Sequence, residues 1–327
     1  MAEQALYFAD DKAKRRYKAR VIIGRVFTYG FLTIFALFML TPFIFMIIAS
    51  FMNADSFNAF VNRADFSKLG LSFGDTGNWS LSNYVVIFSK EGTTSLGTPY
   101  QHTGFAQYYL NTIIASVGST TVTVVTAVLA AFAFARLEFK GKDVLFMLLL
   151  ATMMIPGEMM VITNYATTKQ LKWEDTFSAL IFVHGVSVFY IYYLRQNFQQ
   201  IPNELYLAAK VDGVGDFGYL IKVMVPIAMP TITTIIILSL MGSWNSYIWP
   251  NLVANGKWLD KSPLNIQTNY DMRLVSNGLM SLFNTQANGE DSIKIAGSMV
   301  VTAPLFVFFL IFRKYIMKGV SRSGIKG

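Results

Sequence analysis

Only a few polar residues of this chain lie where they could do chemistry. Glu158 is the one carboxylate well inside a long apolar run, and charges in such runs are usually functional. The segment GSWNSYIWP contains Trp244, Asn245 and Tyr247, whose ring faces and amide suit sugar rings and hydroxyls. These four residues are candidates to line a translocation path. The alternatives are a structural hydrogen bond for Glu158, and helix packing or an interfacial aromatic belt for the others.

Enzymatic chemistry is not expected. The chain has no cysteine and two histidines, which excludes a thiol nucleophile and argues against a metal site. The apolar runs contain no paired carboxylates, and the sequence has no G-x-x-x-x-G-K-S/T phosphate-binding loop. We therefore expect no catalytic residue, no metal and no nucleotide bound by this chain itself.

The composition is that of an integral membrane protein. Hydrophobic residues make up 54% of the 327 residues and charged residues 14%, against about 25% charged in soluble domains. A spanning helix needs about 20 apolar residues. Six runs without Asp, Glu, Lys or Arg meet or approach that length: 26–54, 107–135, 144–157 (continuing past Glu158 to about 168), 177–194, 223–256 and 295–312. We therefore expect an all-α, polytopic fold with six transmembrane helices, the fifth of which begins near residue 228 because of Pro226 and Pro230.

The positive charges predict the orientation. With the N-terminus in the cytoplasm, most of the 27 Lys and Arg residues fall in cytoplasmic segments. This places the N- and C-termini inside, accounts for the net charge of +8, and makes nucleic acid an improbable partner. Residues 1–25 form a basic cytoplasmic segment, which either lies on the inner leaflet or is disordered. Residues 26–327 are expected to form one membrane domain.

A partly polar stretch, residues 201–226, interrupts this pattern on the cytoplasmic side. Pro202 and Glu204 are typical of a helix start, and Leu205, Ala208, Ala209 and Asp212 repeat at helical spacing. Gly213 then allows a turn. Small side chains on one helix face let another surface approach closely, so we interpret this stretch as a docking element.

The same stretch resembles the cytoplasmic coupling loop of ABC importer permeases, whose pattern is Glu-Ala-Ala, three residues, Gly, nine residues, then Ile-x-Leu-Pro. Ala208, Ala209, Gly213 and Pro226 fall on that spacing, and Leu207 replaces the usual Glu. Glu204, one turn earlier, could supply the missing ionic contact. The segments AFAFARLEFKGKD, MMIPGEMMVI and GSWNSYIWP are similar to carbohydrate-type permeases, specifically to the smaller maltose permease subunit.

The resemblance implies a type I ABC importer permease fold, with its core at about 107–316 and its coupling loop at 201–226. It implies a non-catalytic subunit in the bacterial cytoplasmic membrane that forms half of the path for a sugar. Its expected partners are a second permease subunit, two ATPase subunits that bind the ATP and Mg, and an extracytoplasmic sugar-binding protein. The alternative is an ion-driven secondary transporter, which would need more buried carboxylates or histidines than Glu158 and His184.

Overall fold

The structure is a computed structural model of the whole chain, and parts of it are described. The described residues are 11–69, 79–89, 91–93, 99–101, 105–254, 271–285 and 291–321. The first ten residues of the expected basic N-terminal segment lie outside them. Residues 11–25 of that segment are helical and continue directly into the first apolar run as one helix, α2 (Asp11–Phe51).

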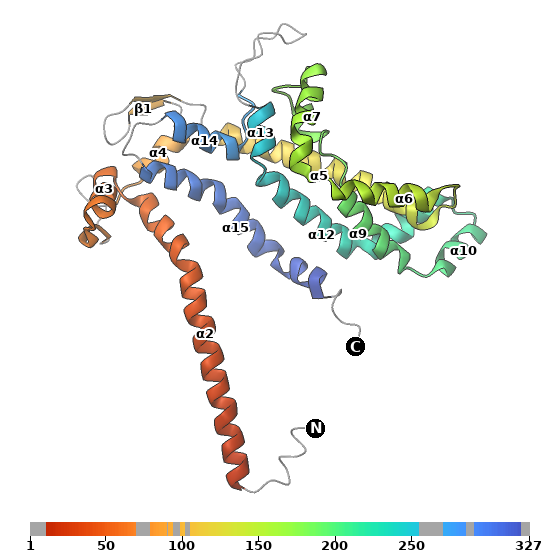
Figure 1. Cartoon of the computed structure of the whole chain (residues 1–327), viewed down its shortest axis with the longest axis horizontal. Coiled ribbons are helices and arrows are strands. Elements are labelled where there is room, and N and C mark those ends of the chain that lie inside the picture. Colours follow the sequence, from red (N-terminus) through yellow and green to blue (C-terminus); the bar gives the residue numbers. More distant parts are fainter. Residues whose placement is uncertain are drawn as a thin grey trace.

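The membrane region is built on α5 (Phe105–Arg136), which packs against α9 (Val188–Gln199) and α12 (Val225–Trp244). Helix α15 (Asp291–Ser321) lies beside α12 on one side and α2 on the other. Most of α2 stands away from the other helices (Figure 1), and its apolar side chains, such as Phe27, Ile34 and Phe38, are exposed. Lipid or another subunit must cover that surface in the membrane.

The described residues contain four helices that are long and apolar enough to cross a membrane, at Tyr17–Phe51, Phe105–Arg136, Asp216–Trp244 and Asp291–Lys314. A fifth candidate is a bent pair, Lys142–Met154 with Gly157–Gln170, whose two parts meet at 98°. The pair comprises α6 (Lys142–Ala151), the 3-10 turn η2 (Thr152–Met154) and α7 (Gly157–Gln170). The bend falls at Pro156, as the segment IPG predicts.

The remaining expected span, 177–194, is not a continuous helix. It consists of α8 (Phe177–Ile181) and the first part of α9, separated by non-helical residues near Gly185. A Cβ on Gly185 would lie 2.6 Å from the Val122 side chain, and one on Gly118 would lie 2.7 Å from Ile181. The hydroxyl of Thr126 donates a 2.8 Å hydrogen bond to the Gly185 carbonyl. Two glycines thus let α5 and the interrupted segment approach closely.

The start of the fifth span also differs from the expectation. Instead of beginning near residue 228, the helix runs without a break from α11 (Asp216–Tyr219) through a π-helical turn, η3 (Leu220–Met224), into α12. Pro226 lies inside this continuous helix, just after the π-helical turn, and supplies no backbone N–H. The π turn shifts the hydrogen-bond register directly before it.

The end of the molecule opposite the 201–226 loop carries short elements. These are α3 (Ala54–Arg63), η1 (Phe66–Leu69), α4 (Ser82–Phe88), β1 (Glu91–Thr93), β2 (Pro99–Gln101), α13 (Ile248–Val253) and α14 (Val275–Thr285). The two strands pair antiparallel, with Gly92 opposite Tyr100. The buried amide of Asn111 donates to the carbonyls of Asp271 (2.7 Å) and Arg273 (2.9 Å), which ties the segment before α14 to α5.

The close approach at Gly185 predicts a stability effect. In Gly185→Ala, the new methyl group overlaps Val122, and such overpacking costs about 1–3 kcal/mol. We expect a lower melting temperature of the detergent-solubilised protein, measured by fluorescence-detected size exclusion after heating. Gly30→Ala on α2 is the matched control, because a Cβ there meets no atom within 4 Å. Equal melting temperatures for the two variants would contradict this packing argument.

Candidate functional site

The 201–226 loop contains a short helix closed by a glycine turn. Helix α10 (Asn203–Val211) begins after Pro202 and carries Glu204 in its first turn, where the helix dipole favours negative charge. It ends at Gly213, whose φ of +74° lies in the left-handed region. The backbone N–H of Gly213 bonds the Lys210 carbonyl (3.1 Å), and that of Val214 bonds the Ala209 carbonyl (2.8 Å). These bonds satisfy the last helical carbonyls and turn the chain towards α11.

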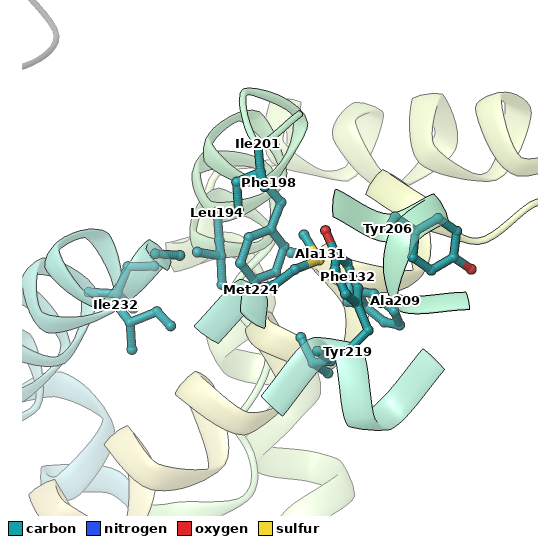
Figure 2. Close-up of a cluster of buried hydrophobic side chains, with 13 residues drawn as sticks. Ala131, Phe132, Leu194, Phe198, Ile201, Tyr206, Ala209, Tyr219, Met224 and Ile232 are labelled. Carbon is teal, nitrogen blue, oxygen red and sulfur yellow. The ribbon is translucent and has the colours of Figure 1, made fainter. Parts of the chain in front are cut away.

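One face of α10 packs against the membrane helices. Tyr206 and Ala209 are both 9% exposed and belong to one buried cluster with Tyr219, which is fully buried. Figure 2 shows the cluster, to which α5 contributes Ala131 and Phe132, α9 contributes Leu194 and Phe198, and α12 contributes Ala228, Ile232 and Ile235. We call this set of side chains the anchor cluster. Through it the loop and three membrane helices share one core.

Polar contacts hold the two halves of the loop together. The Tyr206 hydroxyl donates a 2.7 Å hydrogen bond to the Asp216 carboxylate. The ammonium group of Lys210 lies 4.0 Å from Asp216 and 4.6 Å from the centre of the Tyr206 ring. Tyr206, and to a smaller extent Asp216, raise the pKa of Lys210, so it stays protonated at neutral pH. The ion pair is about half exposed and contributes little stability by itself.

Two arginines fasten the loop to the neighbouring ends of α5 and α9. Arg136, the last residue of α5, donates hydrogen bonds to the carbonyls of Phe198 (2.8 Å) and Ile201, where α9 ends. Arg195 on α9 donates to the Phe134 carbonyl (3.1 Å), and its guanidinium lies 4.0 Å from the centre of the Phe146 ring. The guanidinium groups thus add charged donors to carbonyls at or just beyond helix ends, and the Phe198 carbonyl also accepts from the Ile201 N–H (3.2 Å).

The opposite face of α10 is exposed. The expected coupling residues Glu204, Leu207, Ala208 and Asp212 lie on it, whereas Ala209 faces the anchor cluster. Val211, which sequence analysis did not single out, is 88% exposed, and Leu207 is 54% exposed. Gly213 and Pro226 are also exposed, the first in the turn and the second at the start of α12. The face therefore presents an apolar strip of Leu207, Ala208 and Val211 with carboxylates at its two ends.

The structure does not gather the four candidate path residues at one point. Glu158 is exposed in the first turn of α7. Trp244 packs on Tyr109, with ring centres 5.9 Å apart, and its indole N–H donates to the Val301 carbonyl (3.3 Å). Asn245 donates to the Met241 carbonyl (2.9 Å) at the end of α12, and Tyr247 is 37% exposed. Trp244 is thus fixed by helix packing, while Glu158, Asn245 and Tyr247 are exposed.

A cavity that sequence analysis missed lies next to this segment. It has a volume of about 230 Å³ and lies between α5, α8, α9, α12 and α13. Its lining combines apolar side chains with the hydroxyl-bearing residues Ser119, Thr123, Ser239, Ser243 and Ser246, and we call it the hydroxyl cavity. The helical spacing of Ser239, Ser243 and Ser246 is visible in the sequence. This spacing alone does not reveal the cavity, because the sequence does not show which helices pack against these three serines.

Comparison with known proteins places the chain in a family. Residues 123–322, more than half of the chain, match the family described as binding-protein-dependent transport system inner membrane component. The arabinooligosaccharides transport permease AraQ of Bacillus subtilis is 27% identical over 265 residues, which cover 81% of this chain and 85% of AraQ. The trehalose/maltose transport permease MalG of Thermococcus litoralis is 27% identical over 294 residues, which cover 89% of this chain and 93% of MalG.

A solved structure shares the fold. One chain of a bacterial ABC transporter that imports the acidic polysaccharide alginate superposes with a TM-score of 0.67 at 20% identity. The match covers 94% of this chain and 99% of that one. Together with the membrane helices, these matches define a non-catalytic, multi-pass permease subunit of the inner membrane. The chain belongs to the family of binding-protein-dependent transport system inner membrane components, which confirms the resemblance found in the sequence.

The arginine contacts predict how the loop responds to loss of its fastening. Arg136→Met leaves the carbonyls of Phe198 and Ile201 without their charged donor, and each such bond contributes about 1.5–3 kcal/mol. We expect faster trypsin cleavage after Lys210 in the membrane-embedded protein, measured by mass spectrometry of the fragments. Lys140→Met, an exposed cation on the same side, should leave the cleavage rate unchanged. An unchanged rate in Arg136→Met would show that Arg136 does not hold the loop.

Proposed function

We propose that this chain is the permease subunit of an ATP-driven sugar importer and that α10 is its coupling helix. The observation that carries the proposal is the division of α10 into two faces. One face belongs to the anchor cluster, and the other presents Leu207, Ala208 and Val211 to the cytoplasm. The transport systems named for the relatives handle arabinooligosaccharides and trehalose or maltose, which supports a sugar as the substrate.

The geometry suggests how work would reach the membrane helices. Closure of an ATPase dimer around ATP and Mg would move the pocket that holds the exposed face of α10. Because packed cores deform little, a displacement of α10 would be passed on through Tyr206 and Ala209 to α5, α9 and α12. These helices would then rock together between inward- and outward-open states. In this mechanism the chain supplies the coupling helix that transmits the movement, and its ATPase partners bind and hydrolyse the nucleotide.

The assembly that fits this role has a second permease subunit, two ATPase subunits and an extracytoplasmic sugar-binding protein. Exposed Glu158, Asn245 and Tyr247 are available to a path shared with the second permease, and Trp244 braces that region through Tyr109 and Val301. Because Leu207 stands where the family pattern has Glu, the contact with the ATPase would be largely apolar, with Glu204 and Asp212 as its charged edges. Membership of the permease family displaces the alternative of an ion-driven secondary transporter.

The exposed face of α10 gives a direct test. Val211→Asp places a charge in the apolar strip and should weaken capture of the ATPase subunit by about tenfold, as loss of a central apolar contact does. Val211→Ile keeps the contact and is the matched control. The measurement is co-purification of the ATPase from detergent-solubilised membranes, normalised to permease content. Undiminished capture by Val211→Asp together with Leu207→Asp would refute the coupling role.

We also propose that both termini are cytoplasmic, from the distribution of Lys and Arg. Because the chain has no cysteine, a thiol reagent would label only the single cysteine introduced into it. Val61→Cys on α3 should react with an impermeant maleimide in intact spheroplasts, because Val61 is exposed and follows the first span. Lys140→Cys, at the opposite end of α5, should react only after permeabilisation. The reverse pattern would invert the orientation.

A further inference from the structure

Non-helical residues from two helix junctions line the hydroxyl cavity. The residues between α8 and α9 contribute His184 and Ser187, and the break between α12 and α13 contributes Ser246. At membrane depth, non-helical backbone is tolerated only where protein buries it or where it lines a water-filled cavity. The non-helical backbone beside the cavity must therefore be covered by protein or be reached by water. Discontinuous helices of this kind commonly form the ligand sites of transporters.

The cavity contains polar groups that can still bond a ligand. The hydroxyls of Ser119 and Ser243 share a 3.1 Å hydrogen bond, and Thr120 donates to Ser239 at the same distance, which fixes the rotamers of one wall. Within the described part of the chain, the ring nitrogens of His184 make no hydrogen bond to protein. One wall is therefore preorganised, and the opposite wall retains hydrogen-bonding capacity.

An aromatic side chain closes the cavity on the α13 side. The indole N–H of Trp249 donates to the Ala179 carbonyl (3.0 Å), and the side chain is 6% exposed, so its position is fixed. The His184 ring meets it edge-on, with ring centres 5.0 Å apart. Aromatic rings beside directed hydroxyl groups are suited to the apolar faces and hydroxyl edges of a sugar ring.

The lining carries no formal charge other than the one that His184 can gain. Among the described residues, no Asp, Glu, Lys or Arg lines the cavity. A carboxylated sugar placed there would lose its hydration without meeting a permanently charged cation, which is costly for a buried charge. The volume of about 230 Å³ is below the range of about 300–1,000 Å³ that is typical of drug-sized ligands. It therefore suits a single sugar ring.

We propose that the hydroxyl cavity is a binding site for one uncharged sugar unit of the substrate as it crosses the membrane. This proposal rests on the proposed function and adds the location and the chemical class of the ligand. The site lies within this chain, between Ser119, Ser243 and His184, and it selects neutral saccharides over uronates. Trp244 and Glu158 are not part of it.

The test uses the complete importer with its binding protein in proteoliposomes. Ser243→Cys places a thiol in the cavity wall, and the chain contains no other cysteine. The rate of modification by a water-soluble methanethiosulfonate is measured with maltotriose, arabinotriose or trigalacturonate, alongside ATP-driven uptake of each. Leu240→Cys, which lines a separate apolar pocket between α5, α12 and α15, is the matched control.

We expect the transported neutral trisaccharide, at about ten times its dissociation constant, to slow modification of Ser243→Cys about tenfold. Modification of Leu240→Cys should not respond to sugar. Uptake of a neutral sugar without protection of Ser243→Cys would overturn the cavity proposal and leave the proposed function intact. Protection or uptake by trigalacturonate alone would overturn the predicted ligand class. Uptake of no sugar at all would refute the proposed function, and this inference with it.

A second variant fills the cavity instead of probing it. Gly242 lines the cavity and a Cβ there would meet no atom within 4 Å, so the side chain of Gly242→Leu starts in open space. We expect about tenfold slower uptake, as for loss of one pocket contact, with ATPase capture and melting temperature unchanged. Gly30→Leu also enters open space, but on α2 away from the cavity, and should transport normally. Normal uptake by Gly242→Leu would argue that no sugar occupies this space.

Discussion

The shared burial of Tyr206 and Ala209 with three membrane helices is the constraint on which the rest of the structure depends. Burying one large apolar side chain contributes about 1.5–3 kcal/mol, whereas a half-exposed ion pair such as Lys210 with Asp216 contributes at most about 1 kcal/mol. The anchor cluster therefore decides where the loop lies, and the polar contacts refine its shape. If only surface ion pairs held α10, a force on this helix would detach it from the membrane helices before those helices moved.

The same constraint explains the unusual composition of α10. Under the proposed coupling role, α10 buries one face in its own protein and offers the other to a partner, which would account for the exposed Val211. Where related loops carry Glu, this chain has Leu207. Its contact with an ATPase would depend more on excluded water than on charge, and would respond less to ionic strength.

Interruptions of the membrane helices follow a second constraint, the need to satisfy backbone groups where lipid offers no partner. Gly185 brings the first interruption close enough to α5 for Thr126 to bond its carbonyl. At the second, Asn245 caps the end of α12 through the Met241 carbonyl. Both breaks are thus supported by neighbouring side chains. The space between them is the hydroxyl cavity, so the same features that resolve the backbone problem also create a polar site in the membrane.

The sequence by itself determined the membrane class, most of the apolar helices, the bend at Pro156 and the position of α10. These features depend on local composition and on residues that are close together in the sequence. It misjudged the segment around Gly185 and the helix start at Pro226, since length and apolarity do not reveal a break that another helix supports. It also could not assign Ala209 to the inner face and Val211 to the outer one. Only tertiary structure decided these points and assembled the hydroxyl cavity, because each depends on which helices pack together.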